Sequence, residues 1–342
     1  MTEIAVWGLG KMGLPLACVF ANAGFHVTGI DVDEKRVAAV NKGEATFPGE
    51  PGLDKLLASA LEKGLFTATV QPARADIHII IVPIELQDKQ ADLSILKDVC
   101  EKISKVLRRG DIVVLESTAP PGTCEDFVTP ILERTGLKKA TDFGVAHCPE
   151  RTMAGTALED ITKKYPKIIG ASDLKTGEAL KNLYSRINEK GVILVRDTRT
   201  AEAVKVFEGI YRDVNIALAN ELAIYCEEAG IDILDVISAA NTQPYCHLHR
   251  PGAGVGGHCI PVYPYFIMNE KTKLIKTARE LNEYMPYHVV DLTEEMLRKH
   301  KISLPKAKIM LLGIAFRSGV RETRNSPFFV IRDELERRGA AV

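Results

Sequence analysis

The sequence predicts an α/β protein: a doubly wound parallel sheet, then a central all-helical domain, then the beginning of a second sheet domain of the same type. Three observations support this prediction. Short apolar strands alternate with helical segments between residues 3 and 197, which is typical of a parallel sheet covered by helices. A long stretch of helical spacing follows, and residues 306–339 then repeat the strand and helix of the N-terminus.

The strands of the N-terminal sheet are short apolar runs bounded by turn residues. They are predicted at residues 3–8, 26–31, 77–83, 111–117, 143–149, 167–172 and 191–197. The helices between them include residues 11–24, 93–108 and 123–135. The first of these helices ends at Gly24, because glycine commonly closes a helix.

The central region begins with one long predicted helix at residues 200–230. Its apolar positions recur every three or four residues and share one side: Val206, Ile210, Val214, Ala217 and Leu222. Thr198 or Thr200 is expected to cap the start of this helix, and Gly230 is expected to close it. Gly209 is the unfavourable residue in its interior, at about 1 kcal/mol relative to alanine.

Two further helices are predicted at residues 232–240 and 274–300. Apolar helix faces of this length favour a homodimer or a higher homo-oligomer. Residues 306–316 then form a predicted strand, and residues 326–339 a helix. The chain ends where a second parallel strand is expected, and a β-α-β unit without that strand cannot bury its apolar face. We therefore expect the chain to break off inside this domain, with domains at residues 1–198, 199–303 and 304–342.

Composition excludes several classes of partner. The 342 residues carry a formal net charge of −1, which leaves no basic excess for nucleic acid. No run of 18 apolar residues predicts a membrane span, and Glu3 and Lys11 do not fit a signal peptide. The seven cysteines are scattered and odd in number. Reduced thiols and a cytoplasmic location are therefore expected.

The first glycine motif, Gly8-x-Gly10-x-x-Gly13, directly follows a predicted strand and opens a predicted helix. Asp31 closes the next strand. This arrangement is the Rossmann dinucleotide fingerprint, in which the glycines let the pyrophosphate approach the helix N-terminus. Asp31 accepts hydrogen bonds from a ribose diol and repels a 2′-phosphate, so NAD is favoured over NADP. The alternative is that the glycines only allow tight packing and that Asp31 only ends a strand.

Two neighbours of this motif are also candidates for binding the cofactor. Met12 lies inside the fingerprint. Arg36 follows Asp31 and is expected near the adenosine, although a solvated helix face explains an arginine there equally well.

The second glycine motif lies in HRPGAGVGGHCIPVYPY, residues 249–265, and has three interpretations. A dinucleotide site is disfavoured because no strand precedes the motif and no helix follows it. A metal site is disfavoured because His258 and Cys259 are adjacent, and neighbours in an extended chain point in opposite directions. A nucleophilic Cys259 fits the backbone N–H groups of a glycine loop, which favour a thiolate. A buried structural cysteine remains open from the residues alone.

Six segments together resemble a known family. They are GLGKMGLPLA, ESTAPPGT, HCPERTMAG, YRDVNIALANELA, PGAGVGGHCIPVYPYF and ETRNSP, in this order. The sequence is similar to the UDP-glucose/GDP-mannose dehydrogenase family, and its cysteine loop looks most like the UDP-N-acetyl-D-mannosamine dehydrogenase branch. The resemblance implies an N-terminal Rossmann domain, a central helical dimerisation domain and a C-terminal Rossmann-like domain that binds the UDP-sugar.

The resemblance also implies a four-electron, NAD-dependent oxidation of the C6 alcohol of a UDP-sugar, without a metal. Cys259 would form a thiohemiacetal and then a thioester, which water releases as the uronic acid. Glu150 would be the acid/base, through a water held partly by Thr118, and Lys205 would stabilise alkoxide charge. Without the family, Glu150 fits an ion pair with Arg151, and Lys205 fits an exposed helix lysine.

Other roles follow from the same resemblance. Arg250 would bind substrate across the dimer, and Arg324 would face the active site from the C-terminal domain. Either arginine fits an ordinary surface position as well. The remaining implied substrate-binding residues are Arg151, Gly254 and Gly257, and the remaining implied cofactor-binding residues are Thr118 and Arg324.

Two positions depart from the family pattern. Tyr263 stands where the family has an aspartate, and a phenol carries no charge near pH 7. Gly209 stands where the family has an asparagine, one helical turn after Lys205. An alternative interpretation is therefore a degenerate or truncated paralogue that binds NAD and dimerises but is catalytically weak or inactive. A third is a two-electron 3-hydroxyacid dehydrogenase, which would not need Cys259.

Overall fold

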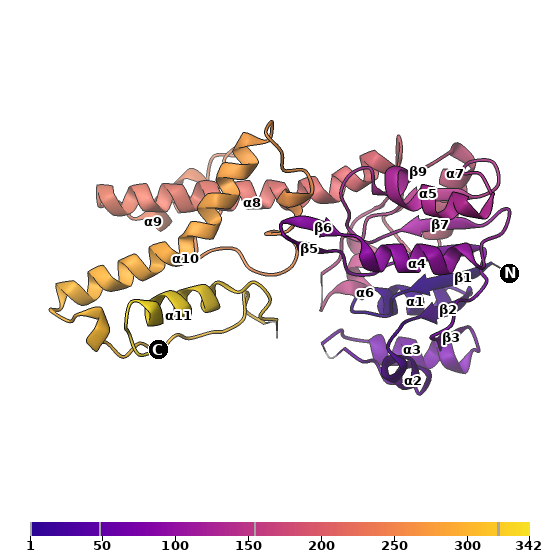
Figure 1. Cartoon of the computed structure of the whole chain (residues 1–342), viewed down its shortest axis with the longest axis horizontal. Coiled ribbons are helices and arrows are strands. Elements are labelled where there is room, and N and C mark those ends of the chain that lie inside the picture. The colour runs from indigo at the N-terminus through magenta and orange to yellow at the C-terminus, as the bar shows by residue number, and fades with distance from the viewer. Residues whose placement is uncertain (1, 48, 154, 320–321) are drawn as a thin grey trace. The chain divides into compact units, whose positions relative to one another are not determined.

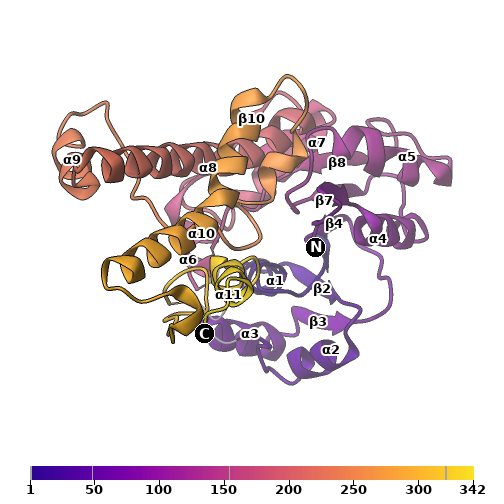
Figure 2. The ribbon, with the colours of Figure 1, turned by 60° about the vertical axis from the view of Figure 1, so that its left-hand side comes forward.

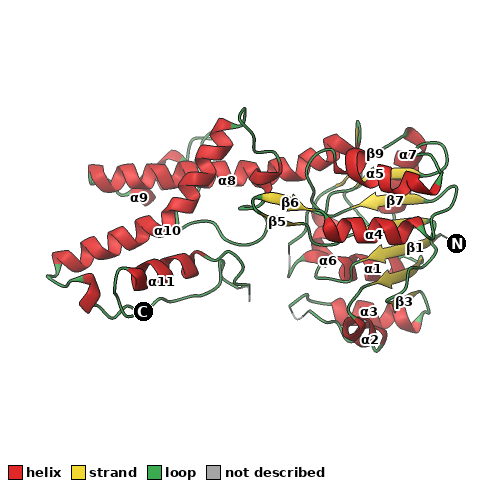
Figure 3. Ribbon diagram, in the orientation of Figure 1, coloured by secondary structure: helices red, strands yellow, loops and turns green. Residues whose placement is uncertain are grey.

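The computed structural model describes residues 2–47, 49–153, 155–319 and 322–342. The chain divides into two compact units, Met1–Val206 and Phe207–Val342 (Figure 1). The first unit is a sheet covered by helices, and the second is built from helices and loops among its described residues (Figure 3). No helix within the described ranges has the length and apolar composition needed to cross a bilayer.

The sheet of the first unit has eight strands in the order β10-β9-β8-β7-β4-β1-β2-β3. Their bounds are β1 Glu3–Trp7, β2 His26–Ile30, β3 Phe66–Thr69, β4 Ile77–Ile80, β7 Ile112–Leu115, β8 Gly144–His147, β9 Lys167–Ala171 and β10 Val192–Val195. The predicted doubly wound parallel sheet is confirmed, with one difference. β8 and β9 pair antiparallel, so the last two strands run opposite to the others.

Some strands of this unit were not predicted from the sequence. β3 is one, and the hairpin of β5 Glu85–Gln87 and β6 Gln90–Asp92 is another. The hairpin turns at Asp88 and Lys89, which both have positive φ, as a tight two-residue turn requires. These strands are three or four residues long, which is too short for a clear periodic pattern.

Alternating residues of the central strand divide the core of this unit into two layers. Ile4 and Val6 pack on one face of the sheet, and Ala5 and Trp7 pack on the other. Helices α1 Gly13–Asn22, α2 Glu34–Asn41, α3 Leu53–Glu62 and α7 Leu174–Tyr184 contribute to the first layer. Helices α4 Ser94–Ser104 and α5 Thr129–Leu132 contribute to the second. This arrangement leaves the carboxyl ends of the strands open to a ligand.

Several short irregular helices complete this unit. The predicted helix at 123–135 consists of a π-helical turn Cys124–Val128, α5, and a 3-10 turn Glu133–Thr135. A short α6 Ala157–Glu159 continues into a second π-helical turn, Asp160–Lys164.

The second part of the chain contains the long helices that the sequence predicts. They are α8 Thr198–Ala229, α9 Ile233–Ala240 and α10 Lys273–Lys299. The predicted cap of α8 was wrong: Asp197 accepts a hydrogen bond from the backbone N–H of Thr200 at 2.8 Å, because a carboxylate before the helix reaches its free N–H groups. The end at Gly230 is confirmed by its φ of +68°.

Two shorter 3-10 turns, Tyr263–Phe266 and Leu304–Lys306, and the helix α11 Pro327–Arg337 complete this unit. Helix α11 packs against α10 through a small core that includes Val290, Ile331 and Leu335 (Figure 2). The predicted strand at 306–316 was wrong. Among the described residues it forms one parallel bridge, between Lys308 and Ala341, because a strand exists only where a neighbouring strand supplies hydrogen bonds.

Candidate functional site

The fingerprint glycines are packed where a side chain has no room. Gly8 has a φ of +102°, and a Cβ built on it would lie 2.4 Å from the carbonyl oxygen of Ile81. A Cβ on Gly13 would lie 1.9 Å from the carbonyl oxygen of Gly8. A Cβ on Gly10 would meet no atom within 4 Å. Gly8 and Gly13 therefore serve the tight turn, and Gly10 keeps the backbone open toward a ligand.

Asp31 holds this turn in place. Its Oδ2 accepts the backbone N–H of Leu9 at 2.8 Å, and its Oδ1 accepts that of Asp33 at 3.0 Å. Arg36 donates from Nη1 to both Asp31 oxygens at 2.9 Å and lies over the ring of Phe47 at 5.3 Å. Arg36 therefore forms part of the candidate ribose site, and the alternative of a solvated helix face does not hold.

The first turn of α1 fits a dinucleotide. Met12 precedes the helix, and no side-chain cap is formed at its N-terminus, a position that suits an anionic group such as a pyrophosphate. The open backbone at Gly10 and the buried Asp31 carboxylate complete the pattern that binds a pyrophosphate and a ribose diol. These residues fit NAD.

Glu150 and Lys205 are brought together in the same unit. Glu150 follows β8 and is half-buried, and Lys205 lies half-buried on α8. Burial raises the pKa of Glu150, while the ammonium of Lys205 and hydrogen bonds from Thr152 act to lower it. A carboxyl with a raised pKa beside a cation is suited to exchange protons near neutral pH.

Thr118 and Arg151 are the other predicted site residues in this part of the chain. Thr118 is half-buried three residues after β7. Arg151 lies over the ring of Tyr165 at 4.9 Å and donates to the carbonyl of Pro166 at 3.3 Å.

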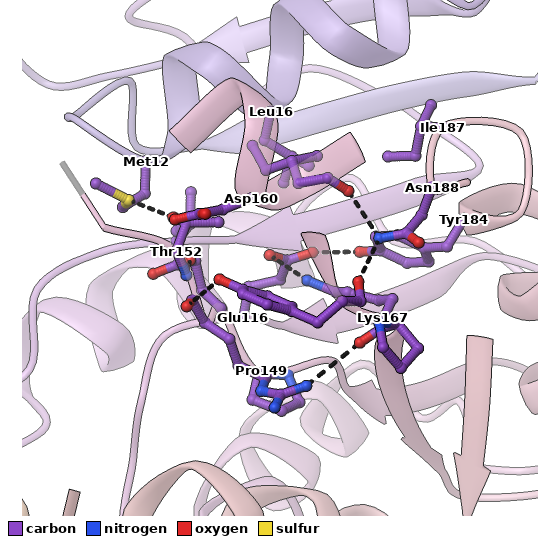
Figure 4. Close-up of a pocket in the computed structure, with 16 residues that line it drawn as sticks. Met12, Leu16, Glu116, Pro149, Thr152, Asp160, Lys167, Tyr184, Ile187 and Asn188 are labelled. Atoms are coloured by element: carbon purple, nitrogen blue, oxygen red, sulfur yellow. Dashed lines mark hydrogen bonds and ion pairs between the residues drawn. The ribbon is translucent and has the colours of Figure 1, made fainter. Parts of the chain in front are cut away.

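A small cavity beside Glu150 is lined by polar residues that the sequence analysis did not identify (Figure 4). Its volume is about 30 Å³, enough for one or two waters. Lys167 pairs with the buried Glu116 at 2.9 Å, and the hydroxyl of Tyr184 donates to the same carboxylate. Lys167 is a second cation that lowers the pKa of Glu150. The ends of β7 and β9 position these side chains, and apolar periodicity gives no signal for such a pair.

The cysteine loop lies in the second unit. Cys259 is half-buried, and a hydrogen bond with Cys259 raises the pKa of His258, against the effect of burial. The expectation that these neighbours point in opposite directions was wrong, because residues 257–260 form bends and a turn instead of an extended strand. An imidazole that contacts a thiol stabilises its thiolate form. His258 is therefore a candidate functional residue that sequence reasoning discarded.

Arg324 and Arg250 differ in their relation to this loop: Arg324 contacts it, and Arg250 precedes it in the chain. The carbonyl of Arg324 accepts the N–H of Gly257 at 2.9 Å, and the charge of Arg324 acts on the pKa of His258. Arg324 thus lies against the loop that carries Cys259. Arg250 is exposed just before the loop.

The loop glycines serve close packing more than anion binding. The N–H of Gly252 donates to Oδ1 of Asn220 at 2.9 Å, and that of Gly257 is taken by Arg324. A Cβ on Gly256 would lie 2.5 Å from Cβ of Phe316, and Gly254, with a φ of +124°, lies against Pro286. At least two of the N–H groups expected to favour a thiolate are therefore occupied by the protein.

Side chains that could bind a metal ion lie close together in the first unit. Among the described residues they form one group, Cys124, His147 and Glu202, whose candidate ligand atoms lie within 4.8 Å of one another. Glu202 accepts the backbone N–H groups of Gly122 and Cys124, so its carboxylate already serves the start of a helical turn. We interpret this buried group as structural.

Comparisons with known proteins match two regions of the chain to one family. Residues 2–188 match the NAD binding domain of the UDP-glucose/GDP-mannose dehydrogenase family, and residues 199–284 match its central domain. NDP-N-acetyl-D-galactosaminuronic acid dehydrogenase from Ralstonia nicotianae is 39% identical over 335 residues, which cover 95% of this chain and 78% of that protein. UDP-N-acetyl-D-mannosamine dehydrogenase from Pyrococcus horikoshii is 39% identical over 331 residues, with the same coverage of 95% and 78%.

Solved structures give the same result. The UDP-N-acetylmannosamine dehydrogenase of Pyrococcus horikoshii matches with a TM-score of 0.94 at 37% identity, covering 99% of this chain and 82% of that one. The enzyme of that name from Staphylococcus aureus matches with a TM-score of 0.88 at 36% identity, covering 98% and 80%. The chain belongs to the UDP-glucose/GDP-mannose dehydrogenase family and is an NAD-dependent UDP-sugar dehydrogenase.

Proposed function

We propose that the chain oxidises the C6 alcohol of UDP-N-acetyl-D-mannosamine to the uronic acid, with Cys259 as the covalent nucleophile. The observation that carries the proposal is the half-buried Glu150 carboxyl, electrostatically coupled to Lys205 in the unit that holds the dinucleotide fingerprint. The names of similar proteins support the sugar: relatives 38% to 40% identical are UDP-N-acetyl-D-mannosamine dehydrogenases. The proposal applies that substrate to this chain.

The cofactor would be held by the chain's own residues. The N-terminal turn of α1, with Gly8, Gly10, Met12 and Gly13, would bind the pyrophosphate, and Asp31 with Arg36 the adenosine ribose. Thr118 and Arg324 are further candidates for contact with NAD. When bound, NAD supplies the two-electron acceptor for each oxidation.

In the first oxidation, Glu150 takes the proton of the C6 hydroxyl, through a water held partly by Thr118. Lys205 offsets the negative charge that develops on the oxygen. The product of this step is an aldehyde. The raised pKa of Glu150 matches this role, because its carboxylate then has useful basicity near neutral pH.

In the second oxidation, the Cys259 thiolate attacks the aldehyde and forms a thiohemiacetal, which is oxidised to a thioester. Water then hydrolyses the thioester, with Glu150 as the base, and the thiol is released. The hydrogen bond between His258 and Cys259 supports an activated thiol. Substrate contacts are proposed for Arg151, Arg250, Gly254 and Gly257.

The proposal extends to the organisation of the protein. We propose domains at residues 1–198, 199–303 and 304–342 and a homodimer formed by the central helices. Large apolar side chains exposed on α8 support this assembly: Phe207, Tyr211, Leu218 and Tyr225. The scattered thiols support a cytoplasmic location.

A substrate panel tests the proposed activity. Purified protein is incubated with NAD⁺ and, separately, UDP-N-acetylmannosamine, UDP-N-acetylgalactosamine and UDP-glucose, and NADH is followed by absorbance. We expect the highest kcat/KM with UDP-N-acetylmannosamine. A higher value with another sugar would reassign the substrate, and no NADH with any of them would overturn the activity.

One observation favours a second candidate, a degenerate paralogue that binds NAD and dimerises with weak or no catalysis. The ring of Tyr263 lies against Gly209, the two positions where the family pattern has a carboxylate and an amide. A chain with this exchange lacks a donor and a charge of the implied catalytic cluster. Measurable turnover at a rate typical of dehydrogenases, of order 1 s⁻¹ or more, would exclude this candidate.

A further inference from the structure

A buried polar network links α8, α10 and the start of the cysteine loop in the second unit. Four of its side chains are at most 2% exposed: Asp213 and Asn220 on α8, and Arg279 and Asn282 on α10. None of them has a role in the proposed chemistry. Polar groups buried to this degree are normally fully hydrogen-bonded, because an unmet partner costs about 1–3 kcal/mol.

The contacts of the network form a chain that leads from Arg279 to the backbone of Gly252. Arg279 pairs with Oδ1 of Asp213, and Nδ2 of Asn282 donates to the same oxygen at 2.9 Å. Nδ2 of Asn220 donates to Oδ1 of Asn282 at 2.9 Å. The side-chain oxygen Oδ1 of Asn220 accepts a hydrogen bond from the backbone N–H of Gly252 at 2.9 Å. The network therefore ends on the backbone of the loop that carries Cys259.

The same network reaches the other side of the loop. Nε of Arg279 lies 3.5 Å from Oε1 of Glu283, and the hydroxyl of Tyr265 donates to that oxygen at 2.6 Å. Gly252 and Tyr265 flank Cys259 on its two sides in the chain. Pro286 of α10 also contacts the loop at Gly254. Both ends of the loop are thus attached to this network, the first through the buried Asn220 and the second through Glu283, which is 47% exposed.

Stability alone does not account for this arrangement. Replacing a buried ion pair by apolar residues of similar volume is often neutral or stabilising. Burial raises the pKa of Asp213, although Arg279 and Asn282 act to lower it, so the network offsets only part of the cost of burying this charge. What it supplies is a fixed geometry, since each amide has one arrangement that satisfies its neighbours.

We propose that the network of Asp213, Arg279, Asn282 and Asn220 positions the Cys259 loop, and that Asn220 and Tyr265 are positioning residues for the nucleophilic thiol. The inference rests on the proposed role of Cys259. Small displacements of a reacting group lower rates steeply, by about 100-fold for 1 Å. A loop held at both ends keeps the thiol in place between successive oxidations.

The test uses the full chain and two variants. Asn220→Ala removes the acceptor for Gly252, and Tyr265→Phe removes only the hydroxyl bonded to Glu283. The second variant keeps the test valid if the first does not fold. The matched controls are Asn215→Ala, which removes an exposed amide bonded within α8, and Tyr284→Phe, which removes an exposed hydroxyl of α10.

Two readouts separate positioning from folding. The first is the rate of Cys259 alkylation by iodoacetamide between pH 6 and 9, followed by mass spectrometry of the peptide that carries Cys259. The second is kcat and KM with UDP-N-acetylmannosamine and NAD⁺. We expect both variants to alter the alkylation profile and to lower kcat by about 10- to 100-fold with little change in KM for NAD⁺. The controls should match the wild type.

The inference would be overturned if folded Tyr265→Phe shows the alkylation profile and kcat of the wild type. Any folded Asn220→Ala would have to give the same result. Alkylation does not depend on turnover. A wild-type protein without dehydrogenase activity would therefore contradict the proposed function, while the alkylation profiles would still decide whether the network positions the thiol.

Discussion

The ring of Tyr263 occupies the space that a side chain at residue 209 would need. A Cβ built on Gly209 would lie 2.3 Å from Cδ2 of Tyr263, far closer than two carbon atoms approach. Gly209 is buried in the interior of α8, where glycine costs about 1 kcal/mol relative to alanine. The two positions that the resemblance marks as departures from the family pattern are therefore in contact in the structure.

This coupling predicts a change of sign in stability. Gly209→Ala should destabilise the protein by roughly 1–3 kcal/mol, because its methyl group collides with Tyr263. In a Tyr263→Ala background the same change should stabilise it by about 1 kcal/mol, from helix propensity alone. Urea unfolding of the four proteins gives the coupling energy. Additive effects of the two substitutions would show that the ring and the glycine are independent.

The same pair predicts how activity responds to the family residues. Gly209→Asn alone should lower stability and activity, since the amide has no room beside Tyr263. Gly209→Asn combined with Tyr263→Asp should raise kcat above that of either single variant, by about 10-fold or more, because a donor and a carboxylate return together. Initial rates at saturating UDP-sugar and NAD⁺ measure this. A double variant no faster than the faster single variant would contradict the prediction.

A pH profile tests the environment of Glu150. Burial raises its pKa, and Lys205 opposes this. As a base it works when ionised, so kcat/KM should rise with pH through a pKa above the ordinary range of a glutamate. Lys205→Met removes a cation that lowers the pKa of Glu150, so the midpoint should move to higher pH. Lys163→Met, which removes an exposed lysine near Glu189, should leave the midpoint in place. A midpoint that moves down would refute the assignment.

Cofactor choice tests the Asp31 and Arg36 pair. Asp31→Asn removes the charge that repels a 2′-phosphate and releases Arg36 from its carboxylate partner. The KM for NAD⁺ should rise by about 10-fold and that for NADP⁺ should fall, because Arg36 then keeps only its longer ion pair with Asp33, at 3.6 Å, and is freer to bind phosphate. Glu34→Gln, which neutralises an exposed acid in the first turn of α2, is the matched control. An unchanged ratio of the two KM values would rule out this role for Asp31.

The contact between His258 and Cys259 predicts a change in thiol reactivity. His258→Ala removes the hydrogen bond and a group that becomes cationic, so the thiolate loses a stabilising partner. Alkylation of Cys259 at pH 7 should slow by about 10-fold. His247→Ala, an exposed histidine upstream, should not change the rate. Equal rates for all three proteins would remove His258 from the site.

Several parts of the fold could be predicted because they leave a local pattern. The fingerprint at Gly8, Gly10 and Gly13 lies between a strand and a helix, and α8 follows from apolar spacing that ends at Gly230. The reversed direction of β9 leaves no such pattern, because a buried strand reads the same in a parallel and an antiparallel pairing. Residues 306–316 read as a strand, yet pairing depends on a partner that periodicity does not specify.

The candidate site divides in the same way. Glu150, Lys205 and Cys259 were identified through motifs, whereas the sequence analysis did not single out Asn220 and Arg279, which are buried in the structure. The pairing of Lys167 with Glu116 joins residues far apart in sequence. His258 was discarded because an extended backbone was assumed where the chain bends. Contacts of this kind depend on tertiary packing, and a single sequence does not encode them visibly.

The central claim is a four-electron oxidation through a covalent intermediate on Cys259, and one measurement tests it most directly. NADH formed per UDP-N-acetylmannosamine consumed is measured to completion for the unmodified chain, for Cys259→Ser and for Cys246→Ser as the control thiol. The account predicts a ratio of two for the unmodified chain and for Cys246→Ser, with turnover to the acid lost in Cys259→Ser. A ratio of one in the unmodified chain, or full conversion to the uronic acid by Cys259→Ser, would contradict it.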